Sequence, residues 1–419
     1  MFKSKKPVVL ANVLEKEELF DLKKSIHNLL TKNNFLNEKS IGRRSIQMNE
    51  CSLMKKQLID LTPTAQNIFD SKTLKPTYAF FSEYRDPDSF LPKHRDNNGN
   101  TYTIDLCLYA KRPWGLFIEG DEYVLGENEA VCFYGEEQEH WRDSLGVDNC
   151  VGVVFFHFAE PDHDFFAFQA SLKSFESEGF ILLNEFSNDL IPDFKLFVDE
   201  KSEVIFEKDN ENVRSIYAFH TNSNFLDWLS KQQIIRKFVT SIIGRDVYLH
   251  QSKINFKNKS TDSIWPFHRD FPFWNIFDHI ELNRMVNVVI YLDDVHESSG
   301  AINFIPRSHR HFLNREIQNS NMIYSLEGSS SNDLLFAFSE EEISELTSKY
   351  GMIGTQSKKG SILFFDPNIV HGSGYSNIDS DRKLMILTFN SCENLPKKSS
   401  LRPTYLASNT FEPIKWTNQ

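Results

Sequence analysis

Long hydrophobic runs, close cysteine pairs and an excess of basic residues are all missing from this sequence. No stretch approaches the roughly 18 uninterrupted apolar residues typical of a transmembrane helix, so no membrane partner is expected. The apolar run near the N-terminus is short and acidic residues follow it at once, which argues against a secretory signal. The five cysteines are odd in number and lie far apart, which favours free thiols in a reducing cytoplasm over disulfides or a cysteine-rich metal site.

Glycine and proline are also sparse, at 17 and 15 residues among 419, whereas phenylalanine alone contributes 37. This composition is typical of folded protein and excludes a collagen-like or linker-dominated chain. The net charge of -12 argues against broad electrostatic attraction to nucleic acid or to an anionic membrane. The length predicts about two domains.

The first part of the chain changes from helical to extended patterning. Apolar spacing predicts helices over residues 7–35 and 53–70. Turn signals such as Asn98-Gly99 then separate short runs that predict strands at 77–84, 101–110, 114–119, 130–134 and 150–158. Strands of this length and spacing favour a jelly roll, also called a double-stranded β-helix. The acidic region 160–215 indicates a connection, and we place the domain border near residue 175.

The second part repeats this plan. Residues 223–243 carry a helical apolar stripe, and strands are expected in VYLHQSKINF, RMVNVVIYLDDV, GAINFIPRSHR, SILFF and KLMILTFN. The excursion over 311–352 has the size of a lid, a binding loop or a mobile segment. The expected fold is mainly β with flanking helices, as two double-stranded β-helix (cupin-like) domains in tandem: 1–175, with a helical preface, and 176–419.

A histidine and a carboxylate, His268 and Asp270, are spaced to hold one metal ion, because alternation along an extended chain puts residues i and i+2 on the same face. His371 follows a buried-looking apolar run and offers a third ligand. Two histidines and one carboxylate on one face of a metal leave the other positions open, which is the arrangement of non-haem Fe(II) oxygenases. The first half repeats the pattern with His94, Asp96 and His140.

These segments carry a family resemblance. Residues 214–392 resemble the phytanoyl-CoA dioxygenase superfamily of Fe(II)/2-oxoglutarate oxygenases and are similar to its ectoine-hydroxylase-like branch. The matching strings, in the family's order, are VYLHQSKINFK, WPFHRDFPFWNIFD, RMVNVVIYLDDV, GAINFIPRSHR and SILFFDPNIVHGSGYSNIDSDRK. The resemblance implies that the catalytic iron ligands are His268, Asp270 and His371. It also implies that Arg382 pairs with the distal carboxylate of 2-oxoglutarate, with Ser373 beside it and Lys257 nearby.

The implied function is a hydroxylase that uses Fe(II), 2-oxoglutarate and O2. The substrate implied by the branch is a small, polar, amino-acid-derived metabolite, and 2-oxoglutarate is decarboxylated to succinate. Related halogenases replace the carboxylate ligand by a small residue, so Asp270 disfavours halogenation. Among the aromatic residues near the dyad, Phe271 and Trp274 are candidates for a wall of the substrate pocket, with core packing as the alternative.

The N-terminal half is more weakly similar to uncharacterised 2-oxoglutarate oxygenase-like domains and departs from them at the cosubstrate position. Val151 stands 11 residues after His140, the spacing that separates Arg382 from His371. The N-terminal triad is therefore open to three interpretations: an active site, a metal site without turnover, or a structural remnant.

The rival hypotheses for the whole chain are a tandem oxygenase in which both barrels oxidise one substrate, and a non-catalytic scaffold with a vestigial metal site. A nucleic-acid demethylase is disfavoured by the acidic net charge. Oligomeric state is left open.

Overall fold

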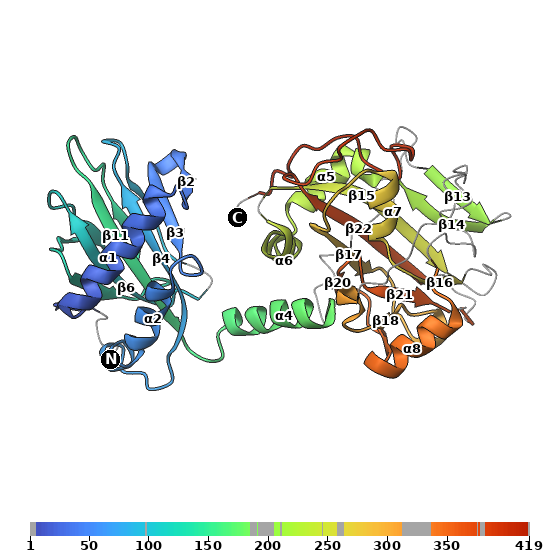
Figure 1. Cartoon of the computed structure of the whole chain (residues 1–419), viewed down its shortest axis with the longest axis horizontal. Helices are drawn as coiled ribbons and strands as arrows, with labels where there is room; N and C mark the ends of the chain where they lie inside the picture. The colour runs from blue at the N-terminus through green and yellow to red at the C-terminus, as the bar shows by residue number, and fades with distance from the viewer. Residues whose placement is uncertain are drawn as a thin grey trace. The chain divides into compact units, whose positions relative to one another are not determined.

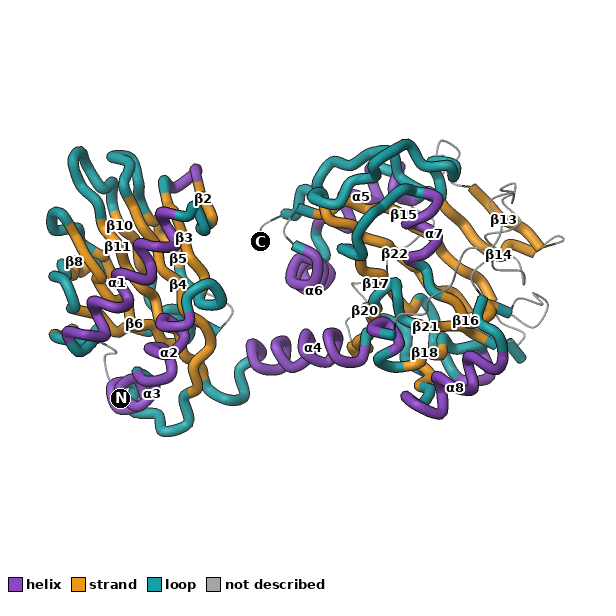
Figure 2. The backbone as a smooth tube through the Cα atoms, viewed as in Figure 1, coloured by secondary structure: helices purple, strands orange, loops and turns teal. Residues whose placement is uncertain are grey.

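A computed structural model describes residues 6–96, 99–184, 191, 205–209, 212–244, 246–257, 264–311, 337–374, 376–377 and 382–417 (Figures 1 and 2). The chain divides into two compact units, Met1–Gln169 and Ala170–Gln419. The division falls inside helix α4 (Asp164–Glu178), which also contains the predicted border at residue 175.

Unit 1 consists of a seven-stranded and a four-stranded sheet with helices. Its elements are β1 Val8–Ala11, α1 Lys16–Thr31, β2 Leu36–Glu38, β3 Arg43–Gln47, α2 Ser52–Asp60, α3 Thr62–Ile68, β4 Lys75–Tyr84, β5 Leu91–His94, β6 Tyr102–Ala110, β7 Leu116–Ile118, β8 Asp121–Tyr123, β9 Glu129–Phe133, β10 His140–Arg142 and β11 Val151–Ala159. The sheet orders are β1-β9-β6-β11-β4-β3-β2 and β5-β10-β7-β8.

One core cluster of unit 1 lies between the larger sheet and the N-terminal helices, and another lies between the two sheets. Strand β11 pairs with β4 on one side and β6 on the other, and each of its residues is buried. Because both faces of β11 are covered, its sequence VGVVFFHFA is an almost continuous apolar run that does not alternate with polar residues. Helix α1 crosses this sheet (Figure 1) and packs Leu22 and Ile26 into a core cluster shared with Phe81 and Phe156. Full burial of such side chains contributes about 1.5–3 kcal/mol each.

Unit 2 again pairs a seven-stranded sheet with a four-stranded one. Its elements are β12 Phe180–Leu183, β13 Ile205–Asp209, β14 Asn212–Tyr217, α5 Ser223–Ser230, α6 Gln233–Ile243, β15 Val247–Lys257, β16 Trp265–His268, α7 Phe271–Phe277, β17 Met285–Tyr291, β18 Asn303–Ile305, α8 Glu340–Tyr350, β19 Ile353–Gly354, β20 Ile362–Phe365, β21 Val370–Ser373 and β22 Arg382–Ser391. The sheet orders are β12-β20-β17-β22-β15-β14-β13 and β16-β21-β18-β19.

The two units share one strand plan. Counted along the chain, β4 to β11 of unit 1 correspond to β15 to β22 of unit 2. The larger sheets contain the runs β9-β6-β11-β4 and β20-β17-β22-β15, and the smaller sheets are β5-β10-β7-β8 and β16-β21-β18-β19. Every strand of one run therefore has its counterpart in the other, and the register of paired strands allows residues of the two units to be compared position by position within these strands.

The mainly β architecture with flanking helices is confirmed, and several boundaries differ from the sequence prediction. The helix predicted over 7–35 is wrong at its start, because Val8–Ala11 forms a strand paired with β9. The helix predicted over 53–70 is divided into α2 and α3, where Pro63 occupies the first turn of the second helix, a position that suits proline. In the excursion 311–352, residues 312–336 lie outside the described residues, and α8 occupies much of the remainder.

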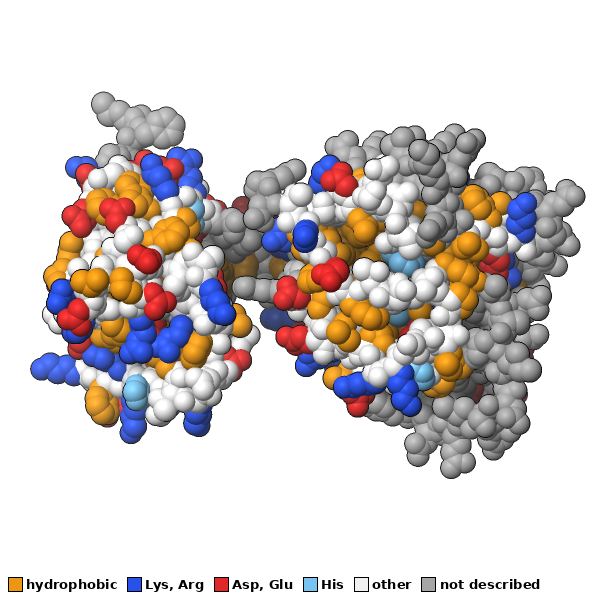
Figure 3. Space-filling view, turned by 90° about the horizontal axis from the view of Figure 1, so that it is seen from above, with side chains coloured by type: hydrophobic (Ala, Val, Ile, Leu, Met, Phe, Trp, Pro, Cys, Tyr) orange, Lys and Arg blue, Asp and Glu red, His pale blue; other side chains and the backbone are white. Residues whose placement is uncertain are grey.

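Surface charge is mixed in both units. Figure 3 shows basic and acidic side chains interspersed on the face that it presents. Among the helices in the described part of the chain, none combines the length and the apolar character needed to cross a membrane.

Candidate active site

Three side chains of unit 2 converge as the sequence predicts: His268, Asp270 and His371. One potential ligand atom from each lies within 4.8 Å of the others. The Nε2 atom of His268 is 3.4 Å from Asp270 Oδ1, and that of His371 is 3.8 Å from Asp270 Oδ2. His268 and His371 are register partners in the antiparallel pair of β16 and β21, which brings residues about a hundred positions apart into one place.

The convergence does not arise from strand alternation, so the reason given for the dyad is wrong. Strand β16 ends at His268, and Asp270 has φ −79° and ψ −42°, a helical conformation at the start of α7. The backbone N–H of Asp270 donates to Pro367 O at 2.9 Å. This bond ties the turn after β16 to the loop before His371 and brings the carboxylate beside the histidines.

Hydrogen bonds orient each of the three side chains. The Nδ1 atoms of the two histidines lie 2.7 Å from Pro266 O and 3.0 Å from Ile369 O. A carbonyl oxygen can only accept, so each Nδ1 carries the proton and each Nε2 lone pair is free to bind a metal. The side chain of Asn287 donates to Asp270 Oδ2 at 2.6 Å.

The protonation states also suit a metal. Burial disfavours the charged form of Asp270, but His371 and His268 outweigh burial and hold the pKa of this carboxyl below its ordinary value. Burial, followed by the neighbouring His268, lowers the pKa of His371 to about 4. At neutral pH the site therefore presents a carboxylate beside a neutral imidazole, the forms that coordinate metal ions.

A cavity opens beside the three side chains. Its apolar wall includes Phe273, Trp274 and Ile302, and its polar wall includes Lys253 and Arg382. Of the two aromatic residues proposed from the sequence, Trp274 lines this cavity. Phe271 packs in the neighbouring cluster with Phe273 and Trp274. An apolar pocket with a few fixed polar groups is the usual form of a small-molecule site.

The predicted cosubstrate residues lie together in the interior. Lys257 and Arg382 are register partners in the pair of β15 and β22 and are 1% and 3% exposed. Lys257 Nζ donates to Ser373 Oγ at 2.7 Å, and Arg382 donates to the carbonyl oxygens of Ser299 and Gly300.

These buried cations fit an incoming dicarboxylate. Burial lowers the pKa of Arg382 to about 10, while burial and then Arg382 lower that of Lys257 to about 6. Among the described residues, no carboxylate lies within ion-pair distance of either cation. A buried guanidinium without an anion is costly, and the lysine beside it can take up a proton when an anion binds, so the residues present fit a 2-oxo dicarboxylic acid at this position.

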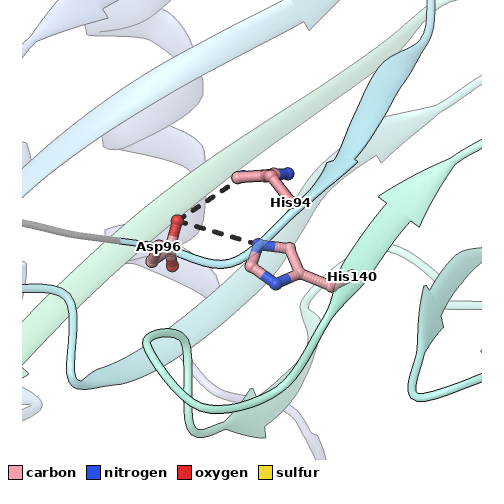
Figure 4. Close-up of side chains that lie close together, drawn as sticks. All are labelled: His94, Asp96 and His140. Carbon is pink, nitrogen blue, oxygen red and sulfur yellow. Dashed lines mark ion pairs between the residues drawn. The ribbon is translucent and has the colours of Figure 1, made fainter. Parts of the chain in front are cut away.

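Unit 1 brings together a second triad, His94, Asp96 and His140 (Figure 4). The Nε2 atoms of His94 and His140 are 3.6 Å and 3.7 Å from Asp96 Oδ1. Each histidine again donates through Nδ1 to the carbonyl two residues earlier, Pro92 at 2.7 Å and Gln138 at 2.9 Å. His94 and His140 are register partners, in the manner of His268 and His371.

Sequence reasoning missed the residues that support the two triads. Asn287 is a buried polar residue in the otherwise apolar strand β17, which is the signal that could have identified it. Thr388 donates to Asn287 Oδ1 at 2.6 Å and so fixes the amide that holds Asp270. In unit 1, Thr103 takes the position of Asn287, donating to Asp96 Oδ2 at 3.3 Å.

Comparisons with known proteins cover the C-terminal part of the chain. The family model described as Phytanoyl-CoA dioxygenase (PhyH) matches residues 182–383. An ectoine dioxygenase of Nocardia farcinica is 30% identical over 257 residues, which cover 58% of this chain and 86% of the relative. The L-proline trans-4-hydroxylase of Streptomyces griseoviridis is 25% identical over 218 residues, covering 52% of this chain and 81% of the relative.

A solved structure supports the fold. The crystal structure of EctD from S. alaskensis in its apoform superposes with a TM-score of 0.51 at 24% sequence identity, covering 62% of this chain and 89% of that chain. The family match begins at residue 182, so unit 1 lies outside it.

Proposed function

The chain belongs to the phytanoyl-CoA dioxygenase family, and from this premise we propose that unit 2 hydroxylates a small, polar, amino-acid-derived metabolite. It is an Fe(II)- and 2-oxoglutarate-dependent oxygenase. The observation that carries the proposal is the convergence of His268, Asp270 and His371 beside a cavity lined by Arg382.

In this proposal His268, Asp270 and His371 hold the iron through two Nε2 atoms and a carboxylate oxygen. When bound, Fe(II) with 2-oxoglutarate and O2 supplies the oxidising chemistry that converts a substrate C–H to C–OH as 2-oxoglutarate is decarboxylated to succinate. The protein orients the reactants and excludes water from the site. Asn287 keeps Asp270 in position through its bond to Oδ2.

Arg382, Ser373 and Lys257 are proposed to hold 2-oxoglutarate. A guanidinium can grip a carboxylate with parallel hydrogen bonds, which fixes the direction of the 2-oxo acid toward the metal. Ser373 lines the cavity, and Lys257 reaches the same place through its bond to Ser373 Oγ.

The substrate class rests on the cavity and on the relatives. Lys253 lines the cavity between Gln251 and Asn255 on one face of β15. Burial lowers the pKa of Lys253, and the largest opposing effect comes from Asp270, so this amine lies near the proposed metal ligands. A basic side chain and apolar side chains that line one cavity suit a substrate with a carboxylate and a hydrocarbon body. The relatives include an ectoine dioxygenase and an L-proline trans-4-hydroxylase, whose names indicate such molecules.

We also propose that each unit is a double-stranded β-helix, since both contain the same eight-strand plan in two sheets. In this proposal unit 1 belongs to the architecture of unit 2 without sharing its sequence family.

A metabolite panel tests the proposed function. The full chain is incubated aerobically with Fe(II), ascorbate and 2-oxoglutarate, together with ectoine, L-proline and other cyclic or acyclic amino acids. A product heavier by one oxygen atom, formed in step with succinate, supports the hydroxylase. A Lys253→Met variant is expected to raise KM for a carboxylate substrate. If no compound is oxidised and no uncoupled succinate forms, the rival scaffold hypothesis is supported and the hydroxylase is contradicted.

A further inference from the structure

We infer that unit 1 is a metal site whose cosubstrate position is closed by the protein's own residues: His94, Asp96 and His140 hold a divalent transition-metal ion without admitting 2-oxoglutarate. Equivalent positions in the two units hold similar metal-ligating residues but different residues at the cosubstrate site. It goes beyond the proposed function, which concerns unit 2.

The ligand positions of the two units are equivalent, and both sets are supported in the same manner. Asp96 N donates to Gly135 O at 2.8 Å, as Asp270 N donates to Pro367 O. Thr103 occupies the position of Asn287, since they are the register partners of Phe133 and Phe365 respectively. A second residue braces Thr103 as well, because its Oγ1 lies 3.0 Å from His157 Nδ1.

The three ligand side chains of unit 1 differ in exposure. His140 is 5% exposed, Asp96 13% and His94 35%, so the triad is half-buried with one accessible side. Three ligands on one face leave the remaining coordination positions for water.

The position that holds the predicted cosubstrate residues in unit 2 has different residue types in unit 1. Tyr84 and Val151 are register partners at the strand ends where unit 2 has Lys257 and Arg382. Tyr84 is fully buried, stacks edge-on against Trp114 with ring centroids 4.8 Å apart, and shares a core cluster with Val151. A packed tyrosine and a valine therefore fill the place where unit 2 presents Lys257 and Arg382.

Unit 1 does contain a buried cation, but a carboxylate of the same unit already pairs with it. Arg142 stands two residues after His140, the position of Ser373 relative to His371, and is 2% exposed. Its guanidinium donates to Asp105 Oδ2 at 2.7 Å and to Trp114 O at 3.0 Å, and it lies 5.0 Å from the centre of the Trp114 ring. Asp105, on the facing sheet, is 0% exposed. An incoming 2-oxo acid would have to displace Asp105 and leave that carboxylate buried and unpaired, which is unfavourable.

Counting bound metal and bound 2-oxoglutarate separately tests the inference. The full chain is loaded anaerobically with Fe(II), dialysed and analysed for metal, then titrated with 2-oxoglutarate while the visible charge-transfer band of a ferrous 2-oxo acid chelate is followed. We expect two iron ions and one 2-oxoglutarate per chain. Asp270→Ala is expected to keep one iron and lose the 2-oxoglutarate, whereas Asp96→Ala is expected to keep one iron and the 2-oxoglutarate.

Two results overturn the inference: a 2-oxo acid chelate on the Asp270→Ala protein, or an iron content that Asp96→Ala leaves unchanged. Failure of the proposed function is distinguishable, since it appears as absence of the chelate from the Asp96→Ala protein. Circular dichroism checks that each variant folds. If Asp96→Ala does not fold, the iron and 2-oxoglutarate counts are repeated with His94→Ala, which removes a more exposed ligand of unit 1.

Discussion

Lys257 and Arg382 are register partners across the β15–β22 pair, so two buried basic side chains lie side by side in unit 2. Burial disfavours the charged form of both side chains, and the charge of Arg382 further disfavours a proton on Lys257. An anion between them offsets both effects. This relationship explains why unit 2 is suited to a dicarboxylate cosubstrate, and it leads to the first two predictions.

Removing the guanidinium is expected to weaken cosubstrate binding more than any surface change. Arg382→Ala should lose about 2–5 kcal/mol of binding free energy for 2-oxoglutarate, or at least about 30-fold in Kd. Arg382→Lys should recover only part of this binding free energy, because an ammonium group cannot form the two parallel hydrogen bonds of a planar guanidinium. Calorimetric titration measures both. Arg284→Ala, which removes an exposed partner of Glu393, is the control. An unchanged Kd in Arg382→Ala contradicts the assignment.

Binding of 2-oxoglutarate is expected to take up a proton. The pKa of Lys257 is about 6 in the free protein, so the amine is largely neutral at pH 8. A bound carboxylate raises this pKa, which means that the complex holds more protons and that affinity falls as pH rises above about 6. Calorimetry in two buffers of different ionisation enthalpy measures the uptake. It should disappear in Lys257→Met, and persistence in that variant would show that another group titrates.

The amide of Asn287 is expected to support the metal. Asn287→Ala removes the 2.6 Å hydrogen bond to Asp270 and should weaken Fe(II) binding by about 10–100-fold, the usual effect of losing a residue that orients a ligand. Thr388→Val acts one bond further away and should have a smaller effect. Metal titration with a competing chelator gives both values. Equal affinities in wild type and Asn287→Ala would remove Asn287 from the proposed site.

The Asp105–Arg142 pair is expected to contribute to the stability of unit 1. Asp105→Asn leaves Arg142 buried without its anion and should lower the free energy of unfolding by about 3–5 kcal/mol. Asp60→Asn breaks an exposed pair with Lys56 and should change it by less than about 1 kcal/mol. Urea titration of the unit 1 transition compares the variants. A similarly small change in the free energy of unfolding for Asp105→Asn and Asp60→Asn would mean that the Asp105–Arg142 pair does not stabilise unit 1.

The sequence was sufficient for the features that depend on composition and spacing. The apolar runs of β11 and β17 identified central strands because both faces of these strands are buried. The triads could be predicted because each His-x-Asp pair and its distant histidine stand in the same order among strand-forming segments, and because this pattern occurs twice in the chain. The predicted residues do converge in both units.

Features that depend on register or on local backbone conformation could not be predicted. Asp270 reaches its position through a helical turn, which the i, i+2 spacing does not distinguish from a strand. The pairing of Asp105 with Arg142 joins residues on two facing sheets, and their separation along the chain gives no sign of it. Strand β1 is formed by its pairing with β9, a tertiary contact that outweighs the helical spacing of its sequence.

Succinate release from 2-oxoglutarate by the iron-loaded full chain tests the central claim most directly. Wild-type protein with Fe(II), ascorbate and O2 should form succinate, and Asp270→Ala should form none above the level without protein. Equal succinate release by the two proteins, or hydroxylated product formed by the wild type without succinate, would contradict the assignment of turnover to His268, Asp270 and His371.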